Sequence, residues 1–239
     1  MIDVYGFSGP NIMKVHIALE ETGLPYKSIE VNVLKSDQFT PEFTALNPNQ
    51  KIPVIVDHDG YGGKPFTLFE SGAILLYISE KTGKLVPADP EGRMKAIQWL
   101  FQQHGGMGPM GGQLAHFYRF APKGLNVEYS EKRYRSENNR LYDLYDSQLA
   151  LRPYIAGDSF TIADIAIWPW IGYHELHNLD LNRRKHLKAW YDKIAERESV
   201  KRVQAAYDGR LMSNSEIEEE ASSPDALDRF FRRGKYLGT

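Results

Sequence analysis

The order of strand and helix signals in the first 85 residues is the strongest constraint on the fold. Alternating apolar residues predict strands, and apolar residues three and four apart predict helices. The predicted elements are, in order, a strand at 2–7, a helix at 10–22, a strand at 26–33, a short helix at 40–46, strand signals within 47–60 and 64–71, and a helix at 71–83. This β-α-β-α-β-β-α order predicts a sheet in which the first two strands are parallel and the last two form a hairpin.

Beyond a Pro- and Gly-bearing joint at 84–92, strand signals nearly vanish and helical spacing takes over. Four stretches carry that spacing, at 94–104, 130–150, 161–177 and 187–204. The predicted domains are therefore an α/β domain at 1–85, an all-helical bundle at 86–208, and a C-terminal tail at 209–239 that is either flexible or docked.

Three shorter motifs give local predictions. Thr161 and Asp164 have the spacing of a helix-capping box, which is a folding signal rather than a catalytic pair. The glycine-rich stretch at 105–112 lacks phosphate-binding spacing, and we expect it to interrupt a helix. The histidines of "HELH" (174–177) are three rather than four residues apart, so we expect no metal site there.

Charge and hydropathy exclude some classes of partner. The net charge is −2 and there is no sustained basic run, so we expect no nucleic-acid partner. No apolar stretch approaches the roughly 20 residues needed to cross a bilayer, and the N-terminus reads at once as a strand rather than a leader. We therefore expect a cytoplasmic protein without a membrane partner.

The chain contains no cysteine. This excludes disulfides, thiolate metal sites and every mechanism that uses a protein cysteine as nucleophile. Any sulfur chemistry must therefore come from a ligand.

Pro53 follows Ile52 at the entrance to a predicted strand, where proline is normally excluded because it cannot donate to the ladder. A cis peptide bond would solve this and would leave the Ile52 backbone groups available to an extended, peptide-like ligand. An ordinary trans proline in an edge strand is the alternative.

Glu70 and Ser71 lie at a predicted strand-to-helix junction. The start of a helix favours a carboxylate, and Glu70 could hold an ammonium group, so the pair would suit the head group of an α-amino acid. Alternatively, Ser71 only caps the helix and Glu70 complements its dipole.

Three motifs in this order, "NPNQKIPVIVD", "LFESGAILLYISEKTG" and "DSFTIADIAIWPW", resemble those of cytosolic glutathione transferases over about residues 1–205. The resemblance implies a thioredoxin-like α/β N-terminal domain with the glutathione site and an all-α C-terminal domain. "GPNIMKV", "QFTPEF" and "QWLFQQHGGMGPMGGQ" are most similar to the bacterial nu class, whose members are glutathione-dependent disulfide-bond oxidoreductases.

The resemblance assigns the turn after the first strand to the glutathione sulfur. It gives a catalytic role to Asn11 and to a threonine hydroxyl at the position that Gly9 occupies here. Ser8, one residue earlier, is the candidate to supply that hydroxyl. Tyr5 resembles the catalytic tyrosine of other classes, but its alternation with apolar strand residues favours packing in the core.

The same resemblance implies the remaining glutathione contacts. The ligand backbone would lie on Ile52 and cis-Pro53, and the γ-glutamyl group on Glu70 and Ser71. The glycine carboxylate would lie near Lys51 and Gln38. A second glutathione would lie near Arg133 and Gln103, with Gln103 coming from a partner subunit. From the residues alone, Lys51 could equally be a solvated surface lysine, and the charged stretch around Arg133 a solvated helix face.

The expected function is therefore glutathione-dependent disulfide reduction by a homodimer, with glutathione as substrate or redox couple, a small disulfide as second substrate, and no metal. Two alternatives remain open. One is conjugation of glutathione to a hydrophobic electrophile, or cleavage of an aromatic ether, in a pocket lined by Phe101, Met107, Met110, Phe117 and Tyr118. The other is a noncatalytic binding protein, which the glycine at position 9 would favour.

Overall fold

The computed structural model describes residues 1–6, 8–208 and 224–236. Contacts divide the chain into two compact units. Unit 1 comprises residues 1–74 together with 202–239, and unit 2 comprises residues 75–201.

Unit 1 contains a four-stranded sheet. Its strands are β1 (Ile2–Gly6), β2 (Tyr26–Glu30), β3 (Val54–Asp57) and β4 (Phe66–Phe69), in the spatial order β2-β1-β3-β4. β1 runs parallel to β2 and antiparallel to β3, which pairs in turn antiparallel with β4. The predicted parallel pair and hairpin are confirmed, although β2 ends three residues earlier than expected.

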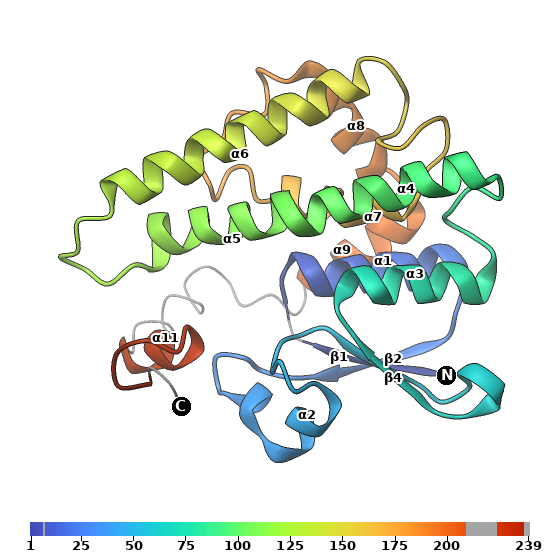
Figure 1. Ribbon diagram of the computed structural model, residues 1–239, viewed down its shortest axis with the longest axis horizontal. Coiled ribbons are helices and arrows are strands. Elements are labelled where there is room, and N and C mark those ends of the chain that lie inside the picture. The colour runs from blue at the N-terminus through green and yellow to red at the C-terminus, as the bar shows by residue number, and fades with distance from the viewer. Residues whose placement is uncertain (7, 209–223, 237–239) are drawn as a thin grey trace. The chain divides into compact units, whose positions relative to one another are not determined.

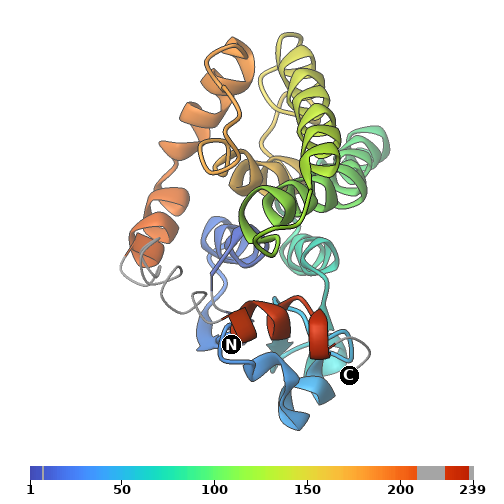
Figure 2. The same cartoon turned by 90° about the vertical axis from the view of Figure 1, so that its left-hand side faces the viewer.

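Helices pack on both faces of this sheet. The helices of unit 1 are α1 (Pro10–Thr22), α2 (Pro41–Leu46) and α11 (Pro224–Phe230). The first four residues of α3 (Ser71–Thr82) also belong to unit 1, and the rest of that helix belongs to unit 2. Short 3-10 turns lie at Asp37–Phe39, Tyr61–Gly63 and Gly234–Tyr236. α1 lies on one face of the sheet and α2 on the other (Figures 1 and 2). α1 buries Ile12, Val15 and Leu19, whose spacing predicted it, and ends at Gly23 in a left-handed conformation.

In the residues described, unit 2 contains helices joined by turns and loops and no strand. Its helices are α4 (Pro90–Gln102), α5 (Gly108–Ala115), α6 (Glu128–Leu149), α7 (Ile162–Ile171) and α8 (Lys185–Ala195), and α9 (Glu198–Asp208) begins in unit 2 and continues into unit 1 (Figure 1). All ten residues of α7 are buried, so this helix forms the centre of the bundle. The predicted pairing of a thioredoxin-like α/β fold with an all-helical bundle is confirmed.

The glycine-rich stretch does not interrupt a helix, contrary to the sequence-based expectation. π-helical segments at Gln103–Met107 and His116–Phe120 join α4 to α5 and extend α5, so the helical path is continuous from 90 to 120. Packing accounts for one of the glycines in this stretch. A Cβ at Gly111 would lie 2.9 Å from two ring atoms of Trp170 on α7. The glycine allows close packing of the two helices.

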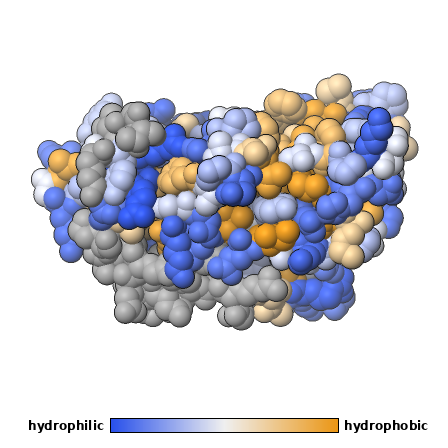
Figure 3. Space-filling view, turned by 90° about the horizontal axis from the view of Figure 1, so that it is seen from below, coloured by the Kyte–Doolittle hydropathy of each residue, from blue (hydrophilic) through white to orange (hydrophobic). Residues whose placement is uncertain are grey.

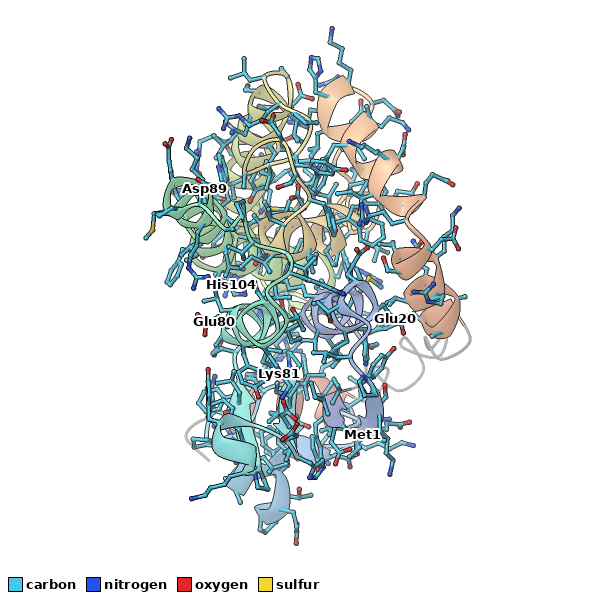
Figure 4. All side chains as sticks on the ribbon, turned by 90° about the vertical axis from the view of Figure 1, so that its right-hand side faces the viewer. Met1, Glu20, Glu80, Lys81, Asp89 and His104 are labelled. Carbon is cyan, nitrogen blue, oxygen red and sulfur yellow. The ribbon has the colours of Figure 1, made fainter. Side chains whose placement is uncertain are left out.

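Side-chain caps fix two helix starts in unit 2. Asp89, labelled in Figure 4, accepts a hydrogen bond of 2.7 Å from the Gly92 N–H and caps α4. Thr161 and Asp164 form the predicted capping box at the start of α7. Local polar residues therefore set where two of the unit's central helices begin.

Among the residues described, no helix is both long and apolar enough to cross a bilayer. The face seen in Figure 3 mixes hydrophilic and hydrophobic residues instead of presenting one continuous apolar surface.

Candidate functional site

The turn between β1 and α1 places Asn11 in the first turn of α1. α1 begins at Pro10, and its cap residue Gly9 has φ +110° and ψ 168°. No side chain caps this helix start and no acidic residue lies in its first turn. The positive end of the helix dipole is therefore not complemented by a carboxylate of its first turn.

The backbone conformation at Gly9 is one that the expected threonine would not readily adopt. A φ of +110° is disfavoured for residues with a Cβ and most of all for a β-branched residue. Space is not the reason, since a Cβ at Gly9 would meet no atom within 4 Å. With this turn geometry, a hydroxyl group near the glutathione sulfur would have to come from a residue next to Gly9.

Ser8 is half-buried and lines a cavity of about 970 Å³ between α1 and β2. His16, Glu20, Tyr26 and Tyr207 line the same cavity; Glu20 is labelled on α1 in Figure 4. His16 Nδ1 and Tyr207 Oη are 3.0 Å apart, and Tyr26 Oη donates to Glu20 Oε1 over 2.9 Å. The sequence reasoning did not find this cavity, because its walls come from segments almost 200 residues apart.

The Ile52–Pro53 peptide bond is cis, as expected. β3 begins at Val54, so the Ile52 backbone lies outside the ladder. The Ile52 side chain packs against a cluster of Val31, Phe43 and Val54. The cluster anchors the residue whose backbone is the candidate for pairing with a peptide-like ligand.

Tyr5 belongs to the same cluster, which supports the expectation that it is a packing residue. Burial, and secondarily the negative charge of Asp3, raise the pKa of Tyr5. The phenol is therefore neutral at physiological pH.

Glu70 and Ser71 lie where β4 meets α3, and the Glu70 backbone is left-handed, with φ +70°. A non-glycine residue in this region is uncommon, and strained backbone of this kind tends to cluster at functional sites. Ser71 is the first residue of α3 and is 4% exposed. The strained junction holds a carboxylate next to a hydroxyl at the positive end of a helix.

Lys14, which the sequence reasoning missed, lies beneath this junction. Its side chain is fully buried and Nζ donates to Ser71 Oγ over 3.5 Å. Burial lowers the pKa of Lys14 well below its usual value, and the negative charge of Glu70 opposes that shift. The available signal was its position on the apolar face of α1, since Ile17 and Ala18, three and four residues later, are also buried.

Gln38 and Lys51 differ in what they can offer a carboxylate. Gln38 is 3% exposed, its Nε2 donates to the Val33 carbonyl over 3.2 Å, and its buried Oε1 has no hydrogen-bond partner. In this orientation the amide offers an acceptor, which suits an N–H and not a carboxylate. Lys51 is exposed and presents an ammonium group. Lys51 is therefore the better match for a carboxylate.

Arg133 and Gln103 belong to unit 2. The Arg133 side chain is 56% exposed and its Nη1 lies 3.5 Å from Glu137 Oε2 on the same helix. Gln103 is fully buried, with an exposure of 0%. Nothing in the described residues groups three or more His, Asp or Glu side chains as a metal site would require.

The residues proposed for a hydrophobic pocket do not share one environment. Met107 is buried in the core of unit 2, whereas Phe101 is 67% exposed. Phe117 stacks on Tyr134 with ring centroids 5.5 Å apart, and Arg135 lies 4.8 Å from the centroid of the Tyr118 ring.

Comparison with known proteins agrees with this architecture. The family model of the glutathione S-transferase N-terminal domain matches residues 1–80, and that of the C-terminal domain matches residues 112–198. The chain is 44% identical over 198 residues to the disulfide-bond oxidoreductase YfcG of Escherichia coli (strain K12), covering 82% of this chain and 91% of that protein. It is 37% identical over 237 residues to the disulfide-bond oxidoreductase YghU of the same organism, covering 94% of this chain and 81% of that protein.

A solved structure shows the same fold. The glutathione transferase of Burkholderia graminis, crystallised with two glutathione molecules bound per subunit, superposes with a TM-score of 0.80 at 43% identity, over 84% of this chain and 86% of that one. Since the two family models match most of the sequence in the expected order, and since the relatives are covered over most of their length, the chain belongs to the glutathione S-transferase family.

Proposed function

We propose that the protein is a glutathione-dependent disulfide-bond reductase whose nucleophile is the thiolate of bound glutathione. That thiolate attacks one sulfur of a small disulfide and forms a mixed disulfide, and the departing thiolate takes up a proton. A second glutathione thiolate attacks the glutathione sulfur of the mixed disulfide and releases the second thiol. Two glutathione thiols are oxidised to glutathione disulfide and one substrate disulfide is reduced, so no protein cysteine is needed, and the chain has none.

The observation that carries this proposal is the junction of Glu70 and Ser71 above the buried Lys14. An α-amino acid head group has an ammonium and a carboxylate. Glu70 suits the ammonium, while the start of α3 and the Ser71 hydroxyl, to which Lys14 Nζ donates from below, favour the carboxylate. The γ-glutamyl end of glutathione has this chemistry, and the left-handed Glu70 backbone supports a binding role.

The rest of the ligand follows along unit 1. The Ile52 backbone beside cis-Pro53 would pair with the peptide part of glutathione, and Lys51 would hold its glycine carboxylate. Gln38, which is 3% exposed and whose Oε1 is buried, would hold the loop at Val33 in place beside the ligand. The sulfur would lie at the start of α1, where Asn11 and the helix dipole favour thiolate over thiol. Ser8 would supply the hydroxyl that Gly9 lacks.

Arg133 is our candidate for holding the second glutathione, because its exposed guanidinium suits a carboxylate. The related transferase of Burkholderia graminis binds two glutathione molecules per subunit, which is the stoichiometry that the proposed redox couple requires.

We also propose that the protein acts as a homodimer in the cytoplasm. Met94 and Phe101 support the dimer, because they are 62% and 67% exposed and lie seven residues apart, on one face of α4. A supply of reduced glutathione, which the cytosol maintains, supports the location. Analytical ultracentrifugation of the wild type and of a Met94→Glu, Phe101→Glu variant tests the dimer, and the variant should be monomeric.

Turnover of 2-hydroxyethyl disulfide by reduced glutathione tests the main proposal. We would compare the wild type with Asn11→Ala and Ser8→Ala, and use Asn182→Ala as the matched control because Asn182 is exposed in unit 2. Isothermal titration calorimetry with glutathione would run in parallel. We expect Asn11→Ala to lose about tenfold or more in kcat/KM, as removal of one stabilising donor does elsewhere, and the control to be unaffected.

Other results would select the alternatives. Glutathione binding with rapid conjugation of 1-chloro-2,4-dinitrobenzene and no disulfide turnover would make the protein a conjugating transferase. Absence of glutathione binding would make it a noncatalytic relative. Full activity in Ser8→Ala would remove Ser8 from the catalytic assignment.

A further inference from the structure

The C-terminal segment at 224–236 packs against the part of unit 1 where the glycine end of glutathione is proposed to bind. α11 and the turn that follows it lie beside the chain that leads into α2 (Figures 1 and 2). Arg229 Nη1 lies 3.4 Å from Ser36 Oγ, and Lys51 Nζ lies 5.7 Å from the centroid of the Phe230 ring. Residues almost 200 positions apart in the sequence thus meet at one surface.

Arg232 occupies the centre of this contact. Its Nη2 donates to Gln50 Oε1, and its guanidinium lies 4.9 Å from the centroid of the Phe39 ring. Gln50 immediately precedes Lys51, and Phe39 immediately follows Gln38. Arg232 therefore contacts the sequence neighbours of Lys51 and Gln38, the two residues that the family resemblance assigns to the glycine carboxylate.

The backbone at Arg232 is left-handed, with φ +49°. The residue after a helix often takes this conformation, but glycine and asparagine are the usual choices. An arginine is therefore unusual at this position, and the left-handed backbone sets the direction in which its side chain leaves the main chain towards Gln50.

Arg232 differs from the arginines around it in its electrostatic partners. Arg229 pairs with Asp225 over 2.9 Å and Arg233 with Asp228 over 2.6 Å. Within the described parts of the chain, neither Arg232 nor Lys51 has a carboxylate at ion-pair distance. Partial burial, and then the positive charge of Arg232, lower the pKa of Lys51. Two neighbouring cations without a counter-ion favour binding of an anion.

We propose that Arg232 joins Lys51 in binding the glycine carboxylate of glutathione, so that the C-terminal segment forms one wall of the glutathione site. This inference rests on the proposed function. A guanidinium offers a carboxylate two parallel N–H donors in a planar fork, a geometry that an ammonium lacks, and one of the two Gln38 N–H groups already donates to the Val33 carbonyl. The segment therefore supplies the planar donor that the thioredoxin-like fold lacks at this position.

Calorimetric binding of two ligands to the full-length protein tests the inference. The ligands are glutathione and its monoethyl ester, which blocks the glycine carboxylate. The variant is Arg232→Gln, and Arg183→Gln is the matched control because it makes the same charge change at an arginine in unit 2 whose side chain is 83% exposed. Thermal unfolding of each variant would check that it folds.

We expect Arg232→Gln to raise the dissociation constant for glutathione about tenfold, the size typical of a charge-assisted hydrogen bond, and to leave that for the ester almost unchanged. Arg183→Gln should behave as the wild type. Arg232→Lys should recover only part of the affinity, since it restores the charge without the fork.

Three results would overturn the inference alone. They are equal losses for both ligands, no loss for either, and tighter binding by Arg232→Gln, which would make the segment an obstruction instead of a wall. In each case the wild type still binds glutathione and turns over disulfide, so the proposed function stands. Absence of glutathione binding by the wild type would overturn the proposed function and this inference together.

Discussion

Lys14 Nζ lies 3.5 Å from Ser71 Oγ, although the two residues are 57 positions apart. Lys14 is fully buried beneath the first residue of α3; burial lowers its pKa well below the usual value, and the negative charge of Glu70, next to Ser71, opposes that shift. A buried ammonium is expensive unless it is paired or hydrogen-bonded, so its retention here is consistent with a role at the site.

Lys14→Met should weaken glutathione binding several-fold, because it removes the hydrogen-bond donor behind Ser71 Oγ while keeping an apolar stem of similar length. The effect should be non-additive with that of Ser71→Ala, since Lys14 acts in part through that hydroxyl. Calorimetry on the two single variants and the double variant measures this coupling. Lys27→Met is the control, because Lys27 is exposed on β2, and additive losses would show that the two residues act independently.

Gly9→Ala should lower the free energy of unfolding by about 1–2 kcal/mol, because φ +110° is strained for any residue with a Cβ. Urea unfolding checks the value. Gly105→Ala is the matched control, since a Cβ there meets no atom within 4 Å and its φ is ordinary. A Gly9→Ala protein as stable as the wild type would mean that this turn relaxes without cost.

Gly111→Ala should destabilise unit 2 by about 1–3 kcal/mol, because the new methyl group would lie 2.9 Å from the Trp170 ring and force the helices apart. The adjacent Gly112→Ala should be neutral or slightly stabilising, since its nearest Trp170 atom is 4.0 Å away and alanine favours a helix. Thermal unfolding of the pair gives the comparison. Equal effects would show that helix propensity, and not packing, governs this stretch.

Asp164→Ala should cost about 3 kcal/mol or more. The carboxylate accepts hydrogen bonds from the Ile155 and Thr161 N–H groups, both over 2.9 Å, and from Trp190 Nε1 over 2.9 Å. Its removal leaves buried donors without partners. Asp158→Ala, at an exposed position nearby, is the control in the same denaturant titration. Similar losses of unfolding free energy in Asp164→Ala and Asp158→Ala would show that the capping box does not stabilise the protein.

His177 should make stability fall in mild acid. Burial, and then the charges of Arg119 and Arg135, lower the pKa of His177 from 6.5 to about 4. Between these values the unfolded chain binds more protons than the folded one, so the contribution is complete above pH 6.5 and is lost as the pH falls towards 4. From pH 7.5 to pH 5 the loss should be about 2 kcal/mol.

The His177→Asn variant should not show this loss of about 2 kcal/mol between pH 7.5 and pH 5, although its stability at neutral pH should be lower than that of the wild type. His174→Asn, three residues earlier, should keep it, because His174 is only half-buried. Urea midpoints across the pH range measure both. Parallel pH profiles for the wild type and His177→Asn would assign the acid sensitivity to another group.

Local signals in the sequence were sufficient for the order of the elements in the α/β domain, whereas in the helical unit they missed α5 and predicted one helix where α8 and α9 lie. The apolar spacing of α1, its stop at Gly23, the β3-β4 hairpin and the Thr161 capping box depend on residues within a few positions of one another. The absence of cysteine likewise restricts the chemistry through composition alone, whatever the fold. The local features are predictable because each is decided by its own stretch of chain.

Tertiary structure decided the rest, because it depends on contacts between distant residues. Lys14 reads as an ordinary helix lysine until α3 covers it, and the glycine-rich stretch reads as a helix breaker until Trp170 packs on Gly111. Arg232 and Gln50, 182 positions apart, meet only in the folded chain. Spacing within a segment reports which face of a helix or strand is apolar, whereas the partner that covers that face is chosen by the packing of the whole unit.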